Sequence, residues 1–327
     1  MTKIRRLLIL FAMIISTCQL LPANDIRQLL HLLDQAIDNR QIFIDQKQTE
    51  LDGLKQMLSR TPANAKFELC EEIFFLYESF NTDSARHYSD LCLEYAQNPD
   101  FGSEEKIQRA VIHQAQCLAV NGLYQQCREL LNAIEFNLAE SNKLGFYRTK
   151  VLLYVWETEF STLPGAFEAS ISNVLSARDS VLKYEASPLS RIQEEAIKAS
   201  YFNRQAGLDL VKPVLDTISL DNPNLRYLAN SAATCCESLQ DEDAASYYYA
   251  MSALSDVTQG VLEHASLRKL ATILYTQGDI SRAYKYINCC LEDAEMCGAR
   301  LRTIQMAQDL PVILEAYQLK VKNRKIA

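Results

Sequence analysis

The chain has 327 residues, of which 48% are hydrophobic, so it is long enough to bury a sizeable core. It contains only 9 glycines and 8 prolines. This scarcity, together with the lack of alternating strand patterns, argues against β-sandwiches and barrels and favours an all-α fold. The net charge of −8 argues against a nucleic-acid-binding surface on this chain, because phosphate recognition needs clustered Lys and Arg.

The first segment has the pattern of an export signal. A basic start, "KIRR", is followed by the apolar run "LLILFAMIISTCQL" and by "LPAND", where processing would occur. We therefore predict a signal peptide over residues 1–23, cleaved after Ala23, and an exported, periplasmic protein. Two alternatives stay open: lipidation at Cys18, and an uncleaved leader that anchors the chain in the inner membrane. Beyond the leader no apolar run approaches the roughly 18 residues that span a bilayer.

Residues 24–62 are predicted to form a helical arm. Its apolar residues recur at alternating steps of four and three, with charge at Arg40 and Lys47. One interpretation is a coiled coil that forms a homodimer, and the other is a helical hairpin that turns near Asn39 and packs on the following domain. Gly53 and the charged positions favour the hairpin. The residues that would form the dimer seam are Ile44, Leu51, Leu54 and Leu58.

Residues 63–298 carry a different pattern, in which helix pairs recur about every 34–40 residues. The clearest unit is 265–294, where Gly278-Asp279 predicts a turn between two amphipathic helices. Small residues at Ala271 and Ala283 would let these helices approach closely. The remaining apolar positions of the unit are Leu267, Leu270, Leu274, Ile280, Ile287, Cys290 and Leu291.

These positions resemble the tetratricopeptide repeat. Residues 67–96, 110–134 and 224–254 match the same offsets less closely, and 144–184 and 189–219 read as two divergent pairs, with Pro164-Gly165 and Ala206-Gly207 near their turns. The resemblance implies a right-handed superhelical solenoid of about six degenerate pairs behind the helical arm. Residues 299–327 are predicted to be a capping helix with a basic tail, because the last unit of an array otherwise exposes its apolar face.

A wider resemblance follows from "LDQAIDNRQIFIDQKQTELDGLKQML", "YESFNTDSARHYSDLCLEYA" and "LPVILEAYQLKVKNRK" behind a leader. Together they are similar to the sensor half of a bacterial regulator family known mainly as a domain of unknown function. That resemblance implies an exported repeat domain, a membrane helix, a cytoplasmic coiled coil and a DNA-binding segment. The sequence ends at Ala327, where the family plan places the membrane helix. Membrane attachment is therefore expected only through an uncleaved leader or a downstream helix.

No catalytic constellation is evident. The four histidines are scattered over separate segments and are expected on the surface or in a groove: His31, His87, His113 and His264. No metal-binding spacing, glycine-rich phosphate loop or nucleophile elbow occurs in the sequence. We therefore predict a non-enzymatic protein without a metal or cofactor.

Ten cysteines in a chain expected to be exported raise the question of disulfides. Cys127, Cys236 and Cys290 occupy predicted helix-packing positions, so they are expected to act as small buried hydrophobes. The adjacent pairs Cys235-Cys236 and Cys289-Cys290 leave a redox role as the alternative, with a bridge to another helix favoured over a strained bond between neighbours. The single tryptophan, Trp156, is expected in the core.

In such arrays the first helix of each pair lines a concave groove that binds peptides or proteins. We therefore predict an exported domain that binds a peptide or protein partner and serves as the periplasmic sensor of a membrane-linked regulator. The alternative is a free periplasmic scaffold or assembly factor. The groove residues predicted from the helical pattern are Arg109, Gln116, Tyr227, Asn230, Thr234, Arg268, Thr272 and Tyr275.

Overall fold

The computed structural model describes residues 25–159, 166–298 and 300–326. These residues form fifteen α-helices and two short 3-10 helices, and they contain no strand, so the all-α prediction is confirmed. The predicted signal peptide, Cys18 and the Pro164-Gly165 turn lie outside the described residues. None of the helices that the structure describes is long and apolar enough to cross a membrane.

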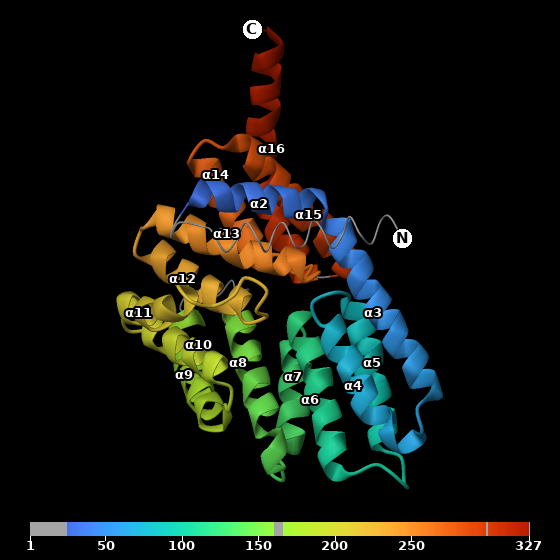
Figure 1. The fold of residues 1–327 in the computed structure, drawn as a ribbon. Coiled ribbons are helices and arrows are strands. Elements are labelled where there is room, and N and C mark those ends of the chain that lie inside the picture. Colours follow the sequence, from blue (N-terminus) through green and yellow to red (C-terminus); the bar gives the residue numbers. More distant parts are fainter. Residues whose placement is uncertain (1–24, 160–165, 299, 327) are drawn as a thin grey trace. The chain divides into compact units, whose positions relative to one another are not determined.

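The helices follow one another with short connections (Figure 1). In chain order they are α2 (Ile26–Asp38), α3 (Arg40–Arg60), α4 (Lys66–Tyr77), α5 (Thr82–Ala96), α6 (Glu104–Val120), α7 (Tyr124–Glu135), α8 (Lys143–Glu159), α9 (Ala166–Tyr184), α10 (Pro188–Ser200), α11 (Arg204–Leu215), α12 (Leu225–Ser238), α13 (Glu242–Thr258), α14 (Ala265–Thr276), α15 (Ile280–Cys297) and α16 (Arg300–Ile326).

Helices α4 to α15 form six consecutive pairs, as the repeat pattern predicts. The turn between α14 and α15 contains Gly278 at φ 86°, a left-handed conformation that glycine adopts without strain. Asp279 then caps α15, since its carboxylate accepts the backbone N–H of Arg282 at 3.2 Å. The predicted contact positions Ala271 and Ala283 are both fully buried.

The divergent pair α10–α11 turns at residues 201–203, ahead of the predicted Ala206-Gly207. Gly207 instead lies inside α11, where a Cβ atom would stand 2.7 Å from the Ala196 carbonyl oxygen and 2.9 Å from Ser200 Cβ. Glycine is therefore needed here for the close approach of two helices rather than for a turn.

The chain divides into two compact units. The α4–α9 unit contains residues 45–194 and 293–305, and the α11–α16 unit contains the described parts of 1–44, 195–292 and 306–327. The boundaries fall inside α3, α10, α15 and α16, so these helices contribute to both units.

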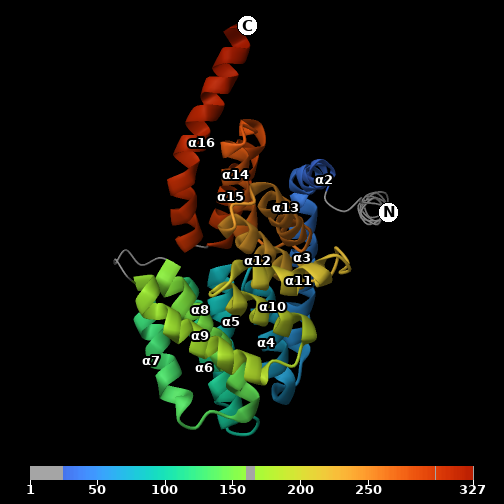
Figure 2. The same cartoon turned by 90° about the vertical axis from the view of Figure 1, so that its left-hand side faces the viewer.

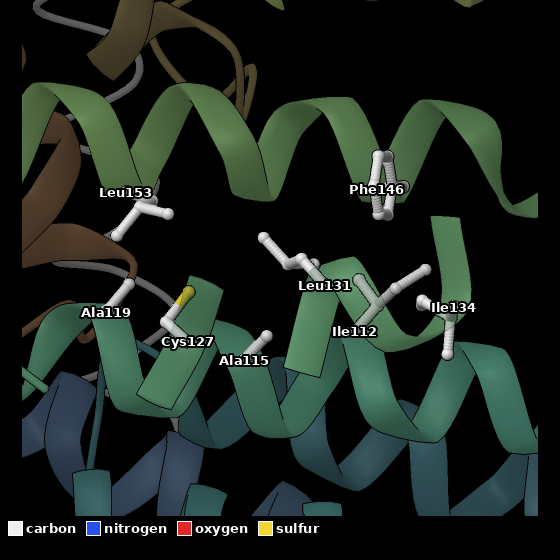
Figure 3. Close-up of a cluster of buried hydrophobic side chains, with 8 residues drawn as sticks. All are labelled: Ile112, Ala115, Ala119, Cys127, Leu131, Ile134, Phe146 and Leu153. Carbon is white, nitrogen blue, oxygen red and sulfur yellow. The ribbon is translucent and has the colours of Figure 1, made fainter. Parts of the chain in front are cut away.

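The core of the α4–α9 unit includes a cluster from α6, α7 and α8 (Figure 3). Leu131 of α7 lies between the two neighbouring helices, and Phe146 and Leu153 of α8 face it. Complete burial of a Leu or Phe side chain contributes about 1.5–3 kcal/mol each. The cluster consists of Ile112, Ala115, Ala119, Cys127, Leu131, Ile134, Phe146 and Leu153.

Residues 293–305 complete the α4–α9 unit. The Thr82 hydroxyl at the start of α5 donates to the Gly298 carbonyl at 3.0 Å. The Arg302 guanidinium lies 4.6 Å from the ring centroid of Trp156, which is buried as predicted for a core residue. The first turn of α16 is therefore held against α8.

In the α11–α16 unit, the arm helix α2 packs along α13. Asp34 also ties it to α15, because its carboxylate accepts hydrogen bonds from Arg282 Nε at 2.8 Å and the Tyr286 hydroxyl at 3.0 Å. The arm breaks at Asn39, close to the predicted turn. Asp25 caps the start of α2, since its side chain accepts the backbone N–H of Arg27 at 3.0 Å.

Helix α16 lies against α14 and α15 in the same unit and extends past them toward the C-terminus (Figures 1 and 2). Tyr317 stacks on Tyr284 with ring centroids 4.0 Å apart, and Lys320 Nζ donates to the Ser281 hydroxyl at 3.0 Å. Ile313 is buried on this side of α16. The helix runs from Arg300 to Ile326, within the segment predicted to cap the array.

Candidate partner-binding face

Helices α4 and α6, the first helices of two successive pairs, bring polar and aromatic side chains together. On α6, Arg109, His113 and Gln116 are spaced by four and three residues, so they share one face of the helix. Helix α4 contributes side chains opposite them. We call this surface the α4–α6 face and define it as Glu68, Glu71, Phe75, Lys106, Arg109, His113 and Gln116.

Glu71 is the central acceptor of the α4–α6 face. Its Oε1 lies 2.8 Å from His113 Nε2 and 3.4 Å from Arg109 Nε. The first contact is a hydrogen bond, whereas Arg109 Nε makes no hydrogen bond and interacts with Glu71 by charge alone. The other ring nitrogen of His113 lies 3.2 Å from Gln116 Oε1, so both nitrogens of the imidazole are engaged.

Aromatic rings enclose the same histidine. The His113 ring lies 4.4 Å from the Phe74 ring and 5.1 Å from the Phe75 ring, measured between centroids. Phe74 is buried, while Phe75 remains 49% exposed. An exposed phenylalanine beside a buried, hydrogen-bonded histidine gives a partner a fixed apolar surface to contact.

A second ion pair borders the face. Lys106 Nζ lies 2.9 Å from Glu68 Oε1 and 5.3 Å from the centroid of the Phe67 ring. Burial opposes ionisation of Glu68, but the hydrogen bond from Lys106, a backbone hydrogen bond and the charges of Lys106 and Arg109 together outweigh it and keep the pKa of Glu68 below its usual value. Both signs of charge are therefore present on the α4–α6 face at neutral pH.

The predicted groove residues Arg109 and Gln116 belong to this face, but sequence reasoning missed its other members. The sequence separation between the contacting residues of α4 and α6 could have identified them. Glu68 and Lys106, Glu71 and Arg109, and Phe75 and His113 are each separated by the same number of positions. That separation is one helix pair, so contacts between successive first helices repeat at the period of the array.

The other six predicted groove residues lie on α12 and α14. Tyr227 is exposed, and the guanidinium of its neighbour Arg226 lies 4.2 Å from its ring centroid. Asn230 is half-buried, and its Oδ1 accepts a hydrogen bond from the Ser266 hydroxyl at 3.0 Å. Thr234 is exposed, but its hydroxyl donates to the Asn230 carbonyl at 2.9 Å.

On α14 the predicted residues are engaged within the unit or lie at its surface. Arg268 NH1 donates to Asp309 Oδ2 of α16 at 2.8 Å. Thr272 is exposed and donates to the carbonyl of Arg268 at 3.2 Å, and Tyr275 is half-buried. Compared with α12 and α14, the α4–α6 face combines an exposed aromatic ring with charged groups that interact between helices, so it is the stronger candidate.

The predicted dimer seam lies mostly inside the chain. Ile44, Leu51 and Leu58 are buried and Leu54 is half-buried. On the same helix, Lys55 Nζ lies 5.4 Å from the centroid of the Tyr77 ring of α4. This burial is what packing of the arm on its own chain requires, and it leaves little of the stripe for a second copy.

The histidines and cysteines are placed as follows. His31 and His87 are exposed as expected, and His113 belongs to the α4–α6 face, where its side chain is buried. The expectation of a surface or groove position is wrong for His264, which is buried ahead of α14 where its carbonyl oxygen lies 3.8 Å from Cys290 Sγ. The burial predicted for Cys127, Cys236 and Cys290 is confirmed.

Residues 37–308, most of the chain, match the family described as the SusR N-terminal TPR domain, where TPR denotes the tetratricopeptide repeat. No curated protein matches the chain.

Proposed function

The chain belongs to the family of SusR N-terminal TPR domains, and from this premise we propose that it is the exported sensor part of a membrane-linked transcriptional regulator. Tetratricopeptide repeats generally mediate protein–protein interaction and lack enzymatic activity. The basic and apolar leader supports export. The partner would be a peptide or protein segment bound on first helices of the array.

The observation that carries this proposal is the composition of the α4–α6 face. Phe75 offers exposed apolar area, and Arg109 and Glu71 beside it offer a donor and an acceptor. An aromatic or arginine side chain at the centre of an interface commonly accounts for much of the binding energy. Because His113 holds Glu71 through a hydrogen bond and is itself hydrogen-bonded to Gln116, little ordering of the acceptor would be needed on binding.

Site-specific crosslinking in the native host tests whether this face binds a partner. A photoreactive phenylalanine analogue is placed at Phe75 and, as a control, at Phe136, which is 103% exposed at the end of α7. We expect a discrete adduct from position 75 that weakens in the Arg109→Ala variant, and none from position 136. No adduct at 75, or equal adducts at both positions, would contradict the proposed face.

The sensor role is tested separately by replacing the chromosomal gene with the Phe75→Asp variant and measuring the transcriptome. A change in the expression of a defined gene set, matched by deletion of the gene, supports the regulator. An adduct at position 75 without any transcriptional change would favour the free scaffold instead. Protease access to the protein in cells with a permeabilised outer membrane tests export, and protection from the protease would overturn it.

A further inference from the structure

Among the nine described cysteines, all of which are buried, Cys70 and Cys92 stand in an unusual relation. They lie on α4 and α5, two helices packed against each other in the first pair of the array. Each has 0% of its surface exposed. Both residues therefore occupy the interior between the same two helices.

The backbone geometry directs the two sulfurs toward each other. Cys70 Sγ lies 3.4 Å from the carbonyl oxygen of Tyr88, which is one helical turn before Cys92. Side chains on a helix lean toward its N-terminus, so the side chain of Cys92 covers the turn of Tyr88. The two sulfurs therefore lie over the same turn of α5, where the Cys70 thiol acts on the ionisation of the Cys92 thiol.

The chemistry of the folded pair restricts when it can react. The hydrogen bond to Cys70, and after it burial, raise the pKa of the Cys92 thiol far above its usual value. The thiolate is the attacking form in thiol–disulfide exchange, so the folded, reduced pair would react slowly with any external oxidant. Oxidation therefore has to occur while the chain folds, before α4 and α5 close over the sulfurs.

We propose that Cys70 and Cys92 form an intrachain disulfide during folding, by exchange with a disulfide-bonded oxidant such as oxidised glutathione or a thiol oxidoreductase. One cysteine thiolate attacks the donor disulfide and forms a mixed disulfide, releasing one donor thiol. The second cysteine thiolate then displaces the other donor thiol. Both cysteines lose a proton, and the two electrons reduce the donor to its thiols.

The other cysteines fit a bridge less well. Cys235-Cys236 and Cys289-Cys290 are neighbours within single helices, where successive side chains point about 100° apart, so a bond between them would distort the helix. Cys117 instead donates to the Ser89 hydroxyl at 3.9 Å. The proposed bond would fasten α4 to α5 immediately next to Glu71 and so stabilise the pair that carries half of the α4–α6 face.

Refolding followed by thiol counting tests the proposal without relying on export. The full chain in a Cys18→Ser background is reduced, unfolded, refolded with oxidised and reduced glutathione, denatured again and alkylated, and its intact mass is measured. We expect two of the remaining nine cysteines to escape alkylation. Trypsin cleaves after Lys66, Arg86 and Lys106, so the tryptic peptides 67–86 and 87–106 should be recovered as one linked species.

Matched variants complete the test. In Cys92→Ser all eight remaining cysteines should be alkylated, whereas in Cys127→Ser, which removes another fully buried cysteine of the same unit, the linked peptides should persist. Alkylation of all nine cysteines in the parent, or linkage of any other pair, would overturn the proposal. Peptide mapping of the parent and of Cys127→Ser decides the question even if Cys92→Ser fails to fold.

Discussion

Replacing Asp34 with alanine should release α2 from its docking site. The carboxylate accepts one hydrogen bond from Arg282 and one from Tyr286, and Lys285 Nζ lies 3.6 Å away. Hydrogen bonds to charged groups contribute about 1.5–3 kcal/mol each. The hydrogen bond from Arg282 contributes less than this, because the Arg282 side chain is 35% exposed and solvent screens its interaction with Asp34.

Tyr286 determines the size of the effect. Its side chain is fully buried, so loss of the acceptor leaves a phenol hydroxyl without its partner in the interior. Together these terms predict a loss of about 2–4 kcal/mol in the free energy for opening α2. Hydrogen–deuterium exchange of α2 amides should then accelerate by roughly 30- to 1000-fold.

Asp38 provides the control, because it lies on the same helix and pairs with Lys285 at 2.8 Å, but its side chain is 65% exposed. Asp38→Ala should change the opening free energy by less than about 1 kcal/mol. Equal exchange rates in the two variants, or an acceleration of less than about threefold in Asp34→Ala, would refute the reasoning.

Three further results are expected. The Leu51→Asp, Leu54→Asp double variant should lose helicity in α3 and α4, measured by hydrogen–deuterium exchange, because Leu51 is fully buried in its own chain. Its oligomeric state, measured by light scattering, should not change. Dissociation of a folded dimer would instead support the predicted dimer seam. Gly207→Ala should lower the free energy of unfolding, measured with urea, by about 1–3 kcal/mol. Gly53→Ala, with nothing within 4 Å of the added Cβ, should raise it by up to about 1 kcal/mol. Effects of the same sign would contradict the packing argument. Burial disfavours ionised Glu237, but hydrogen bonds from Tyr249 and Lys269 outweigh this effect and lower the pKa of Glu237. Glu237 therefore contributes stability above its unfolded-state pKa, and this contribution is lost as the pH falls through the lower folded-state pKa. In Glu237→Gln the free energy of unfolding should fall less steeply at acid pH than in the parent, and an unchanged acid dependence would exclude this contribution.

Most of the fold follows from local sequence signals. Apolar periodicity, the turn at Gly278-Asp279 and the small residues Ala271 and Ala283 are properties of one helix pair, so they can be read without knowing the rest of the structure. The docking of α2 on α13 and α15 could not be read in this way. It joins segments far apart in the chain through Asp34, an ordinary acidic residue on an amphipathic helix.

The candidate site was predicted only in part for a similar reason. Projection of a helix identifies which residues share a face, and this placed Arg109 and Gln116 correctly on one side of α6 with His113 between them. It does not give the register between two first helices, which decides that Glu71 meets His113. It also cannot distinguish a buried histidine from an exposed one, because burial depends on Phe74 and Phe75 of the neighbouring helix.

The attachment of α2 has a consequence for the synthesis of the protein. Helix α2 is the first described helix to be made, yet Asp34 and its partner Tyr286 are 252 positions apart. Its apolar face, which includes Leu29, Leu33 and Ile37, therefore stays without its final partners until nearly the whole chain has emerged. Such long-range closure slows folding and leaves the apolar face of this helix open to aggregation until α13 and α15 have been made.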